Sequence, residues 1–125
     1  MPSSSSDPSA VMAAQLADHD ANASDCEAMQ KILSIVGRRW TGAVLLACTR
    51  GARRFSEYRR LVVGISDRLL SQRLRELESL GLLEREVIPT TPVQILYRPS
   101  VRGEELITAL QPLLGWGSRH LSRSA

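Results

Sequence analysis

The stretch SEYRRLVVGISDRLLSQRLRELESLG, residues 56–81, decides the fold of this chain. A first helix is predicted over Ser56–Val62 with a serine at its N-cap, and Val63-Gly64-Ile65 makes a tight connection. A second helix is predicted over Ser66–Leu80, again capped by its serine and stopped by Gly81. Two capped helices joined by a turn of about three to four residues predict a helix-turn-helix.

The second predicted helix has an apolar side and a polar side. Leucines recur on one side, at Leu69, Leu70, Leu74, Leu77 and Leu80. The other side carries Arg68, Ser71, Gln72 and Arg75, which follow the spacing of one helix face and which we call the reading stripe. Glutamine pairs with an adenine edge, arginine with a guanine edge, and serine with either an edge or a phosphate. The stripe predicts base contacts in a major groove, and the alternative is an ordinary solvated helix face.

The charge distribution favours the same kind of partner. The chain has 16 basic and 13 acidic residues, and Lys31 is the only lysine. Residues 1–30 contain acidic side chains and no basic ones, so the positive charge lies beyond them. Arginine suits bidentate contacts to phosphate and guanine, although a solvated basic face is the alternative. Candidate contacts to the DNA backbone are Arg53, Arg54, Ser56, Arg59, Arg60 and Ser66.

The N-terminal part divides into a tail and a helix. Residues 1–23 are predicted to form a flexible acidic tail, in which Ala10–Asp18 permits a short helix. Ser24 to Glu27 fits a capping box, and apolar residues at helical spacing then predict a helix that stops at Gly37. Its apolar residues are Met29, Ile32, Leu33 and Val36. Residues 24–125 form one predicted domain, because a chain of this length suffices for one core.

The segments around the helix pair complete the architecture. Trp40–Cys48 is almost wholly apolar and predicts a buried central helix, although periodicity alone does not exclude a strand. After Gly81, two alternating runs at Leu83–Val87 and Val93–Tyr97, with Pro89-Thr90-Thr91-Pro92 between them, predict a β-hairpin. A hairpin directly after such a helix pair is a wing. The expected fold is mainly α with a small antiparallel β-sheet, a winged helix-turn-helix.

A C-terminal helix is predicted from Ser100 onward. Its apolar face consists of Leu106, Leu110, Leu113, Leu114 and Leu121, with Trp116 near its end, while Pro112, Gly115 and Gly117 weaken its middle. This is more apolar surface than so small a domain covers with its own core. We therefore expect dimerisation through this helix, and the alternative is a helix folded back on its own domain.

Several motifs occur in a recognisable order. They are Cys26, Gly37-Arg38-Arg39-Trp40, Arg54-Phe55-Ser56-Glu57-Tyr58, Gly64-Ile65-Ser66, the run Leu70–Glu78 and Gly81-Leu82-Leu83, continued by Pro89, Pro92, Tyr97, Gly103, Trp116 and Gly117. Together they resemble the HxlR-type winged helix-turn-helix transcriptional regulators, relatives of the MarR-like regulators. The resemblance covers residues 26–120. It implies a homodimer on an inverted-repeat operator in double-stranded DNA, a short three-stranded sheet, and a dimer built from the N- and C-terminal helices, with Met29, Leu106, Leu110, Leu113, Leu114 and Trp116 at the interface.

The chain departs from that family in three places. Val93 and Gln94 stand where the family usually has a proline and a basic residue, which puts a wing arginine contact to the minor groove in doubt. Tyr97-Arg98-Pro99-Ser100 replaces the usual Tyr-Ser-Leu-Thr. Arg98 is the hypothetical source of charge for the wing tip and so a further candidate contact to the DNA backbone. The acidic start before Ser24 is the third departure.

Cys26 is the candidate sensor. It is predicted at the second position of a capped helix, where unpaired backbone amides favour a reactive thiolate, while Asp25 and Glu27 oppose it. In some members of the family a cysteine at the matching place senses oxidants or electrophiles, so the same role here is a hypothesis; the alternative is an unreactive thiol near the dimer interface. Cys48 is expected in the core. A small-molecule effector is the other candidate signal, and no residue identifies it.

Other classes of function find no support in the sequence. It has no CxxC pair, no histidine at metal-ligand spacing, no glycine-rich phosphate loop and no nucleophile elbow, so we expect no enzyme, no cofactor and no metal. It has neither a signal peptide nor an apolar run of membrane length, and we expect a cytoplasmic protein that does not enter membranes. The alternative function is a winged-helix module that binds an acidic protein instead of DNA.

Overall fold

The computed structural model describes residues 22–121. The predicted tail and the short helix at Ala10–Asp18 lie outside these residues. The chain falls into two units, residues 1–38 and residues 39–125, and each is described by itself. Within the described residues, no single helix is long and apolar enough to cross a membrane; α2 and α3, introduced below, pass the test of length and composition only as a bent pair.

The first unit contributes one helix, α2 (Asn22–Val36). It ends where the sequence predicts, at Gly37, whose N–H donates to the Leu33 carbonyl at 2.8 Å. The predicted capping box is wrong, because Ser24 already lies inside the helix. Alanine at position 23 lets the helix continue toward the N-terminus at little cost, and the Glu27 carboxylate pairs with Lys31 one turn later, at 3.5 Å.

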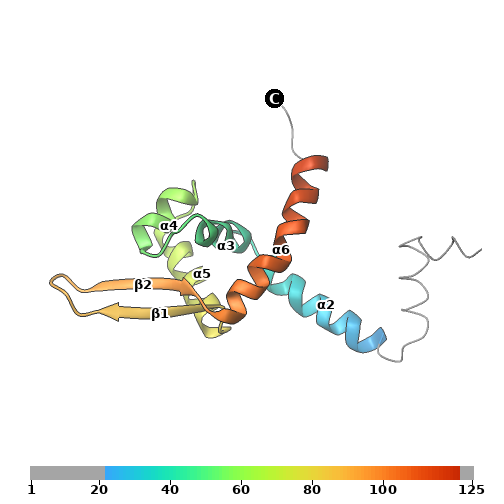
Figure 1. Cartoon of the computed structure of the whole chain (residues 1–125), viewed down its shortest axis with the longest axis horizontal. Coiled ribbons are helices and arrows are strands. Elements are labelled where there is room, and N and C mark those ends of the chain that lie inside the picture. Colours follow the sequence, from blue (N-terminus) through green and yellow to red (C-terminus); the bar gives the residue numbers. More distant parts are fainter. Residues whose placement is uncertain (1–21, 122–125) are drawn as a thin grey trace, which may run out of the picture. The chain divides into compact units, whose positions relative to one another are not determined.

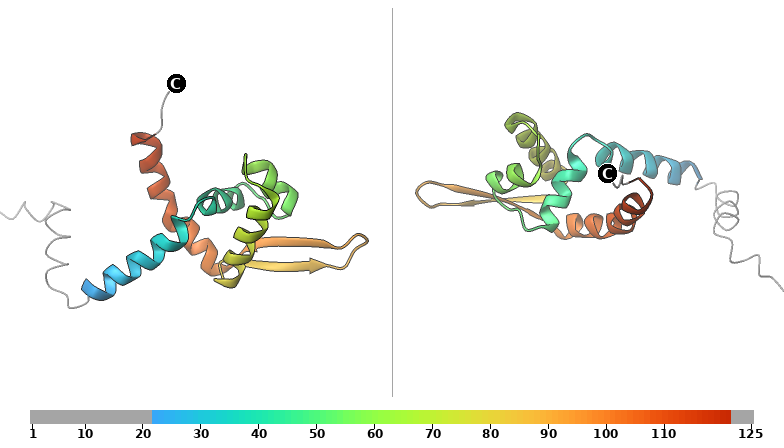
Figure 2. Two further views of the ribbon diagram at one scale, coloured as in Figure 1. Left: turned by 180° about the vertical axis from the view of Figure 1, so that it is seen from behind. Right: turned by 90° about the horizontal axis from the view of Figure 1, so that it is seen from above.

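The second unit holds the predicted winged helix-turn-helix. Its elements are α3 (Thr41–Thr49), α4 (Phe55–Leu61), α5 (Asp67–Ser79), β1 (Leu83–Ile88), β2 (Gln94–Pro99) and α6 (Val101–His120). The hairpin of β1 and β2 extends away from α3, α4 and α5, with its turn at the end far from α6 (Figures 1 and 2). The predicted fold class, mainly α with a small antiparallel sheet, is confirmed.

The core of this unit lies where α3, α4 and α5 meet. Fully buried side chains come from every one of these helices and from the start of β1, namely Val44, Leu45, Tyr58, Leu70, Leu74, Leu77 and Leu83. The predicted buried helix at Trp40–Cys48 is thus confirmed as α3, and Cys48 lies in the core as expected. Burying each leucine contributes roughly 1.5–3 kcal/mol, so these contacts fix the angle between the two helices of the motif.

Tyr58 supplies the polar contact inside this core. Its hydroxyl donates to the Tyr97 carbonyl at 2.7 Å and lies 3.3 Å from the Cys48 sulfur, which ties α4 to both β2 and α3. Burial raises the pKa of the Tyr58 hydroxyl and that of the Cys48 thiol. Both groups therefore stay protonated at neutral pH, as a buried hydrogen-bonded pair should.

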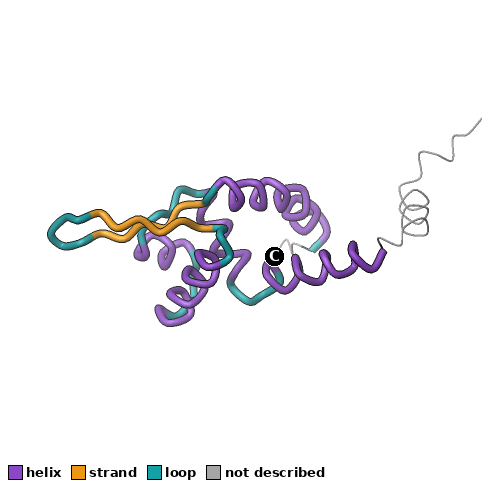
Figure 3. Tube along the Cα trace, turned by 90° about the horizontal axis from the view of Figure 1, so that it is seen from below, coloured by secondary structure: helices purple, strands orange, loops and turns teal. Residues whose placement is uncertain are grey.

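The sheet is an antiparallel hairpin, shown in orange in Figure 3. Its register runs from Leu83 opposite Pro99 to Ile88 opposite Gln94, which leaves residues 89–93 as the turn. The predicted extended piece before α4 adds a single bridge, Arg54 to Leu96, supported by a 2.7 Å hydrogen bond from the Tyr97 N–H to the Arg53 carbonyl. The third strand implied by the family resemblance is therefore one residue pair.

The chain turns directly from β2 into α6. Ser100 caps this helix as predicted: its hydroxyl accepts from the Gly103 N–H at 3.0 Å and donates to the Gly81 carbonyl at 2.6 Å. The Ser100 N–H also donates to the Leu82 carbonyl at 3.1 Å. The start of α6 is thus fixed against the residues that follow α5, and the helix continues through Pro112 to His120.

Candidate nucleic-acid interface

The reading stripe lies on α5, whose N-terminus is capped as the sequence predicts. The Ser66 hydroxyl accepts the Leu69 N–H at 3.1 Å, and Gly81, with a φ of +76°, ends the helix. Three side chains of the stripe, Arg68, Gln72 and Arg75, are exposed, and Ser71 is half-buried. Within the described residues none of the three exposed side chains makes a side-chain hydrogen bond or ion pair. Their donors and acceptors are therefore available to base edges.

The buried side of α5 differs from its predicted composition. Leu70, Leu74 and Leu77 are buried as expected, but Leu69 is half-buried and Leu80 is 39% exposed. Arg73, which is only 7% exposed, also lies on this side, where an arginine was not expected. Positions 70, 73, 74 and 77 follow the i, i+3, i+4, i+7 pattern, so helical spacing could have placed this arginine on the buried side.

Arg73 anchors α5 to a neighbouring part of the chain. Its Nε donates to the Arg39 carbonyl at 2.9 Å, and its Nη1 lies 2.6 Å from Glu76 Oε1. A buried guanidinium is stable only when its donors are satisfied, and these two contacts satisfy them in part. Arg73 therefore joins α5 to the chain just before α3, where Trp40 adopts a left-handed φ of 77°.

The predicted backbone-contacting residues around α4 have different surroundings. Ser56 is the second residue of α4 and does not cap it, because Arg54 occupies the cap position. The Glu57 carboxylate caps this helix instead: its Oε1 accepts the backbone N–H groups of Arg53 and Arg54, both at 2.9 Å. These two hydrogen bonds hold the pKa of Glu57 below its ordinary value of 4.5.

The arginines of this region fall into engaged and available groups. The Arg53 Nη1 donates to the carbonyls of Ala52, at 2.6 Å, and Cys48, at 3.2 Å, so this guanidinium ends α3. Arg59 Nη1 lies 3.4 Å from an Asp67 oxygen at the start of α5. Arg60 is exposed and makes no side-chain contact of this kind with another described residue. Arg60 is therefore the cation of α4 most available to a phosphate.

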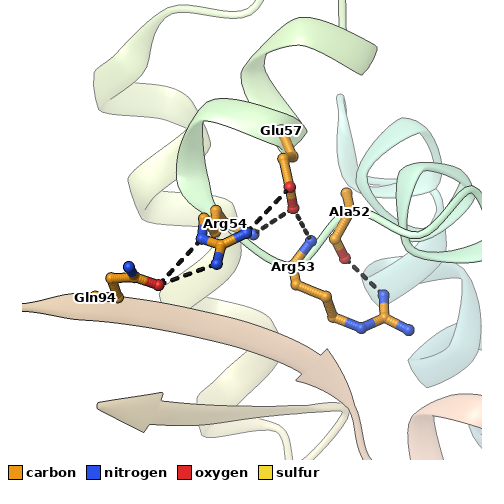
Figure 4. A network of polar contacts seen from close by, with 5 residues as sticks. All are labelled: Ala52, Arg53, Arg54, Glu57 and Gln94. Atoms are coloured by element: carbon orange, nitrogen blue, oxygen red, sulfur yellow. Dashed lines mark hydrogen bonds and ion pairs between the residues drawn. The ribbon is translucent and has the colours of Figure 1, made fainter. Parts of the chain in front are cut away.

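Two further arginines relate to the wing. Arg98 lies near the base of β2, opposite Glu84, and its guanidinium pairs with Glu86 on the neighbouring strand. The hypothesis that Arg98 carries charge at the wing tip is therefore wrong, because the register places the tip at residues 89–93. Arg54 instead reaches the wing from α4 through Gln94, as Figure 4 shows.

Cys26, the candidate sensor, lies on α2 in the first unit and is exposed. It is the fifth residue of that helix, and the predicted second position is wrong because α2 begins at Asn22. The unpaired amides of a helix belong to its first turn, so the helix N-terminus gives little support to a reactive thiolate here. The exposure of Cys26 is the structural feature that favours a sensor role.

The predicted dimerisation residues leave apolar surface uncovered. On α6, Leu113, Leu114 and Trp116 are exposed, whereas Leu106 and Leu110 are half-buried. The Trp116 ring contacts only the His120 ring among the described aromatic side chains, with 5.3 Å between centroids. Met29 on α2, considered by itself, is 55% exposed. An open depression lies along α6 and is lined by Val101, Glu104, Glu105, Thr108 and Ala109.

The comparison with known families decides the assignment. Residues 35–125, which contain every element of the second unit, match the family described as HxlR-like helix-turn-helix. This chain belongs to the HxlR-like helix-turn-helix family. It is a helix-turn-helix transcriptional regulator and not an enzyme.

Individual HxlR-like relatives agree in sequence and in fold. The HTH-type transcriptional regulator YodB of Bacillus subtilis is 33% identical over 94 residues, which cover 75% of this chain and 84% of YodB. A solved structure of the reduced form of YodB matches with a TM-score of 0.66 over 74% of this chain and 90% of that one. The redox regulator HypR in its oxidized form is 30% identical and matches with a TM-score of 0.69, over 78% of this chain and 98% of HypR.

Proposed function

We propose that this HxlR-like regulator binds an inverted-repeat operator as a homodimer, with α5 of each copy in a major groove. The observation that carries the proposal is the reading stripe on a helix that Ser66 caps and three buried leucines hold. Its Arg68, Gln72 and Arg75 are exposed and have no side-chain partner among residues 22–121. Helices presented in this way read base edges through bidentate contacts of arginine and glutamine. A DNA-bound regulator of this kind acts in the cytoplasm.

Selection of genomic fragments by the purified protein tests this proposal. We expect a palindromic site with half-sites about one helical turn apart. Arg75→Ala should lose about 1–3 kcal/mol of binding free energy and relax the preference at one base pair, if Arg75 reads that base. Arg119→Ala, which removes the same charge from the last turn of α6, is the matched control and should leave the selectivity unchanged. Unchanged selectivity in Arg75→Ala would refute the assignment of that residue.

The same selection separates DNA recognition from the alternative, a winged-helix module that binds an acidic protein. A basic surface binds any duplex through phosphate contacts, and such binding weakens with salt in either case. Sequence preference over scrambled competitor is specific to an operator-binding protein. Equal binding to selected and scrambled duplexes at physiological salt would favour the interaction module.

The homodimer is supported by the uncovered apolar side chains of α6, since isolated monomers rarely expose such a cluster. Sedimentation equilibrium tests it. Leu113→Glu introduces a charge at a side chain that is 59% exposed in one copy of the chain, so the fold should tolerate it while a dimer interface should not. A chain that sediments as a monomer without any substitution would refute the dimer.

We infer that an oxidant or electrophile acting on Cys26 is the signal, with a small ligand as the alternative. Two observations support it: the Cys26 thiol is exposed, and the similar proteins include YodB, solved in reduced and diamide-treated forms, and the redox regulator HypR. Diamide should change operator binding of the unmodified chain and of Cys48→Ala, whose thiol is buried, but not of Cys26→Ser. Equal responses of the unmodified chain and Cys26→Ser would end the hypothesis.

A further inference from the structure

Arg54 is held from two sides at the junction between α4 and the wing (Figure 4). Its Nε and Nη2 both point to the Gln94 Oε1, at 3.3 and 3.0 Å. Its Nη1 lies 3.5 Å from Glu57 Oε2. A guanidinium has donors only, so it is the amide oxygen of Gln94 that must face it. One long side chain is thus fixed by a strand that is 40 residues away along the sequence.

The backbone around Arg54 is fixed as firmly as its side chain. The Arg54 N–H donates to Glu57 Oε1, and Arg54 forms the isolated bridge with Leu96 on β2. The neighbouring Arg53 carbonyl accepts the Tyr97 N–H at 2.7 Å. Both ends of the Arg54 side chain are therefore tied to β2. Its charge has a defined place relative to the wing, which an unrestrained arginine would not have.

Gln94 restrains this arginine without cancelling its charge. Arg59 and Arg98 are each paired with a carboxylate on another element, Asp67 and Glu86 respectively. The group that β2 contributes to Arg54 is a neutral amide, which orients the guanidinium by hydrogen bonds alone. Arg54 also remains half-exposed, with 51% of its side chain accessible.

The end of this guanidinium that Gln94 does not occupy can still contact a pair of oxygens. Gln94 occupies the edge formed by Nε and Nη2. At the other end, Nη1 lies 3.5 Å from Glu57 Oε2, and the remaining N–H groups of Nη1 and Nη2 make no hydrogen bond within the described residues. Such an end donates two parallel hydrogen bonds to a pair of phosphate oxygens. DNA that receives α5 in its major groove brings its backbone past the adjacent wing.

We propose that Gln94 is a positioning residue that presents the Arg54 guanidinium to a phosphate of the DNA backbone beside the wing. The proposal rests on the proposed function, since it concerns the same DNA interface. By holding the side chain before DNA arrives, Gln94 removes the entropic cost of ordering it on binding. Arg54 contributes the charge, and Gln94 acts entirely through Arg54.

A double-mutant cycle on operator binding tests this coupling. Arg54→Ala should weaken binding about tenfold and lower the slope of log affinity against log salt by about 1. Gln94→Leu, which keeps an aliphatic side chain but loses the amide, should weaken binding about three- to tenfold. In the Arg54→Ala background, Gln94→Leu should have no further effect. Gln94→Glu should also weaken binding, because it restrains Arg54 but cancels its charge.

The matched control uses another exposed arginine of the wing. Arg85 lies on β1 opposite Tyr97. Because side chains alternate between the two faces of a strand, Arg85 and Gln94 lie on opposite faces of the hairpin. Arg85→Ala and Gln94→Leu should therefore have additive effects on affinity. Additive effects of Arg54→Ala and Gln94→Leu would overturn the proposal, as would a Gln94→Glu variant that binds operator as tightly as the unmodified chain.

A measurement on the free protein separates this proposal from the proposed function. The proton on Arg54 Nε, followed by ¹⁵N-edited NMR, should exchange slowly with solvent in the unmodified chain and rapidly in Gln94→Leu. Slow exchange together with selective operator binding but zero coupling in the cycle overturns the role of Gln94 and leaves the proposed function intact. Loss of sequence selectivity in the unmodified chain overturns the proposed function, and this proposal with it.

Discussion

Gly103, at the start of α6, gives a sharp test of how this helix is attached to the winged domain. Gly103 is buried against the segment that follows α5. A Cβ at this position would lie 2.0 Å from the carbonyl oxygen of Leu82 and 3.0 Å from its carbonyl carbon. Both are backbone atoms, so no side-chain rotation relieves the clash. Gly103→Ala must therefore move the helix or the chain beneath it.

The size of the effect follows from two opposing contributions. Overpacking of this kind costs about 1–3 kcal/mol, and alanine returns at most about 1 kcal/mol through its higher helix propensity. We expect Gly103→Ala to lower the free energy of unfolding by about 2 kcal/mol and the melting temperature by roughly 5–10 °C. Gly117→Ala is the matched control in the same helix, because a Cβ there meets no atom within 4 Å. It should raise stability by up to about 1 kcal/mol.

Urea denaturation followed by circular dichroism measures both variants. The protein concentration must be the same in every experiment, since dimerisation makes the apparent stability concentration-dependent. Operator binding of the folded Gly103→Ala variant should also weaken, because the Gly81–Leu82 segment that it displaces directly follows α5. If Gly103→Ala proves as stable as Gly117→Ala, the close packing of α6 on Leu82 is wrong.

Three further predictions concern the core and the capping of α4. Leu74→Ala should cost about 2–5 kcal/mol in urea denaturation, because Leu74 is fully buried, whereas Leu80→Ala should cost about 1 kcal/mol or less; equal costs would contradict the burial pattern of α5. Tyr58→Phe should cost about 1 kcal/mol in the same assay through the lost hydrogen bond to the Tyr97 carbonyl, and an unchanged midpoint would show that this bond contributes nothing. The folded pKa of Glu57 lies below its ordinary value of 4.5, so its contribution to stability is complete above that pH and is lost as the pH falls through the folded pKa. Unfolding measured between neutral pH and pH 3 should therefore show a steeper loss in the unmodified chain than in Glu57→Gln, and parallel curves would contradict the capping role.

Helix ends and strands that depend only on neighbouring residues were predicted well from the sequence. Ser66 and Gly81 bound α5 because an N-cap hydroxyl and a left-handed glycine act on neighbouring residues alone. Ser100 begins α6 for the same reason. Alternation along residues 83–87 and 93–97 predicted the hairpin, since its pairing needs only a short turn. The family motifs distributed along the chain led to the assignment that the match over residues 35–125 establishes.

Two predicted N-caps were wrong because the helix starts earlier in the chain than the serine that was expected to cap it. Ser56 was the better N-cap by residue type, yet α4 starts at Phe55 because residues 53 and 54 pair with β2 and Glu57 accepts their N–H groups. Ser24 was a good cap by residue type as well, but the chain before it is already helical. The burial of Arg73 was not predicted because a charged side chain suggests exposure to solvent, whereas its position in the helix places it on the buried side of α5.

The sequence alone determined the periodic elements of this protein, their order and the exposed side of α5 that carries Arg68, Gln72 and Arg75, because each depends on spacing within one segment. Tertiary structure decided which arginines remain available. Arg59 and Arg98 are paired with carboxylates on other elements, and Arg54 is held by Gln94 across the wing junction. The physical reason is that an arginine side chain reaches across several ångströms to whatever acceptor the fold brings near, and sequence spacing contains no information about that acceptor.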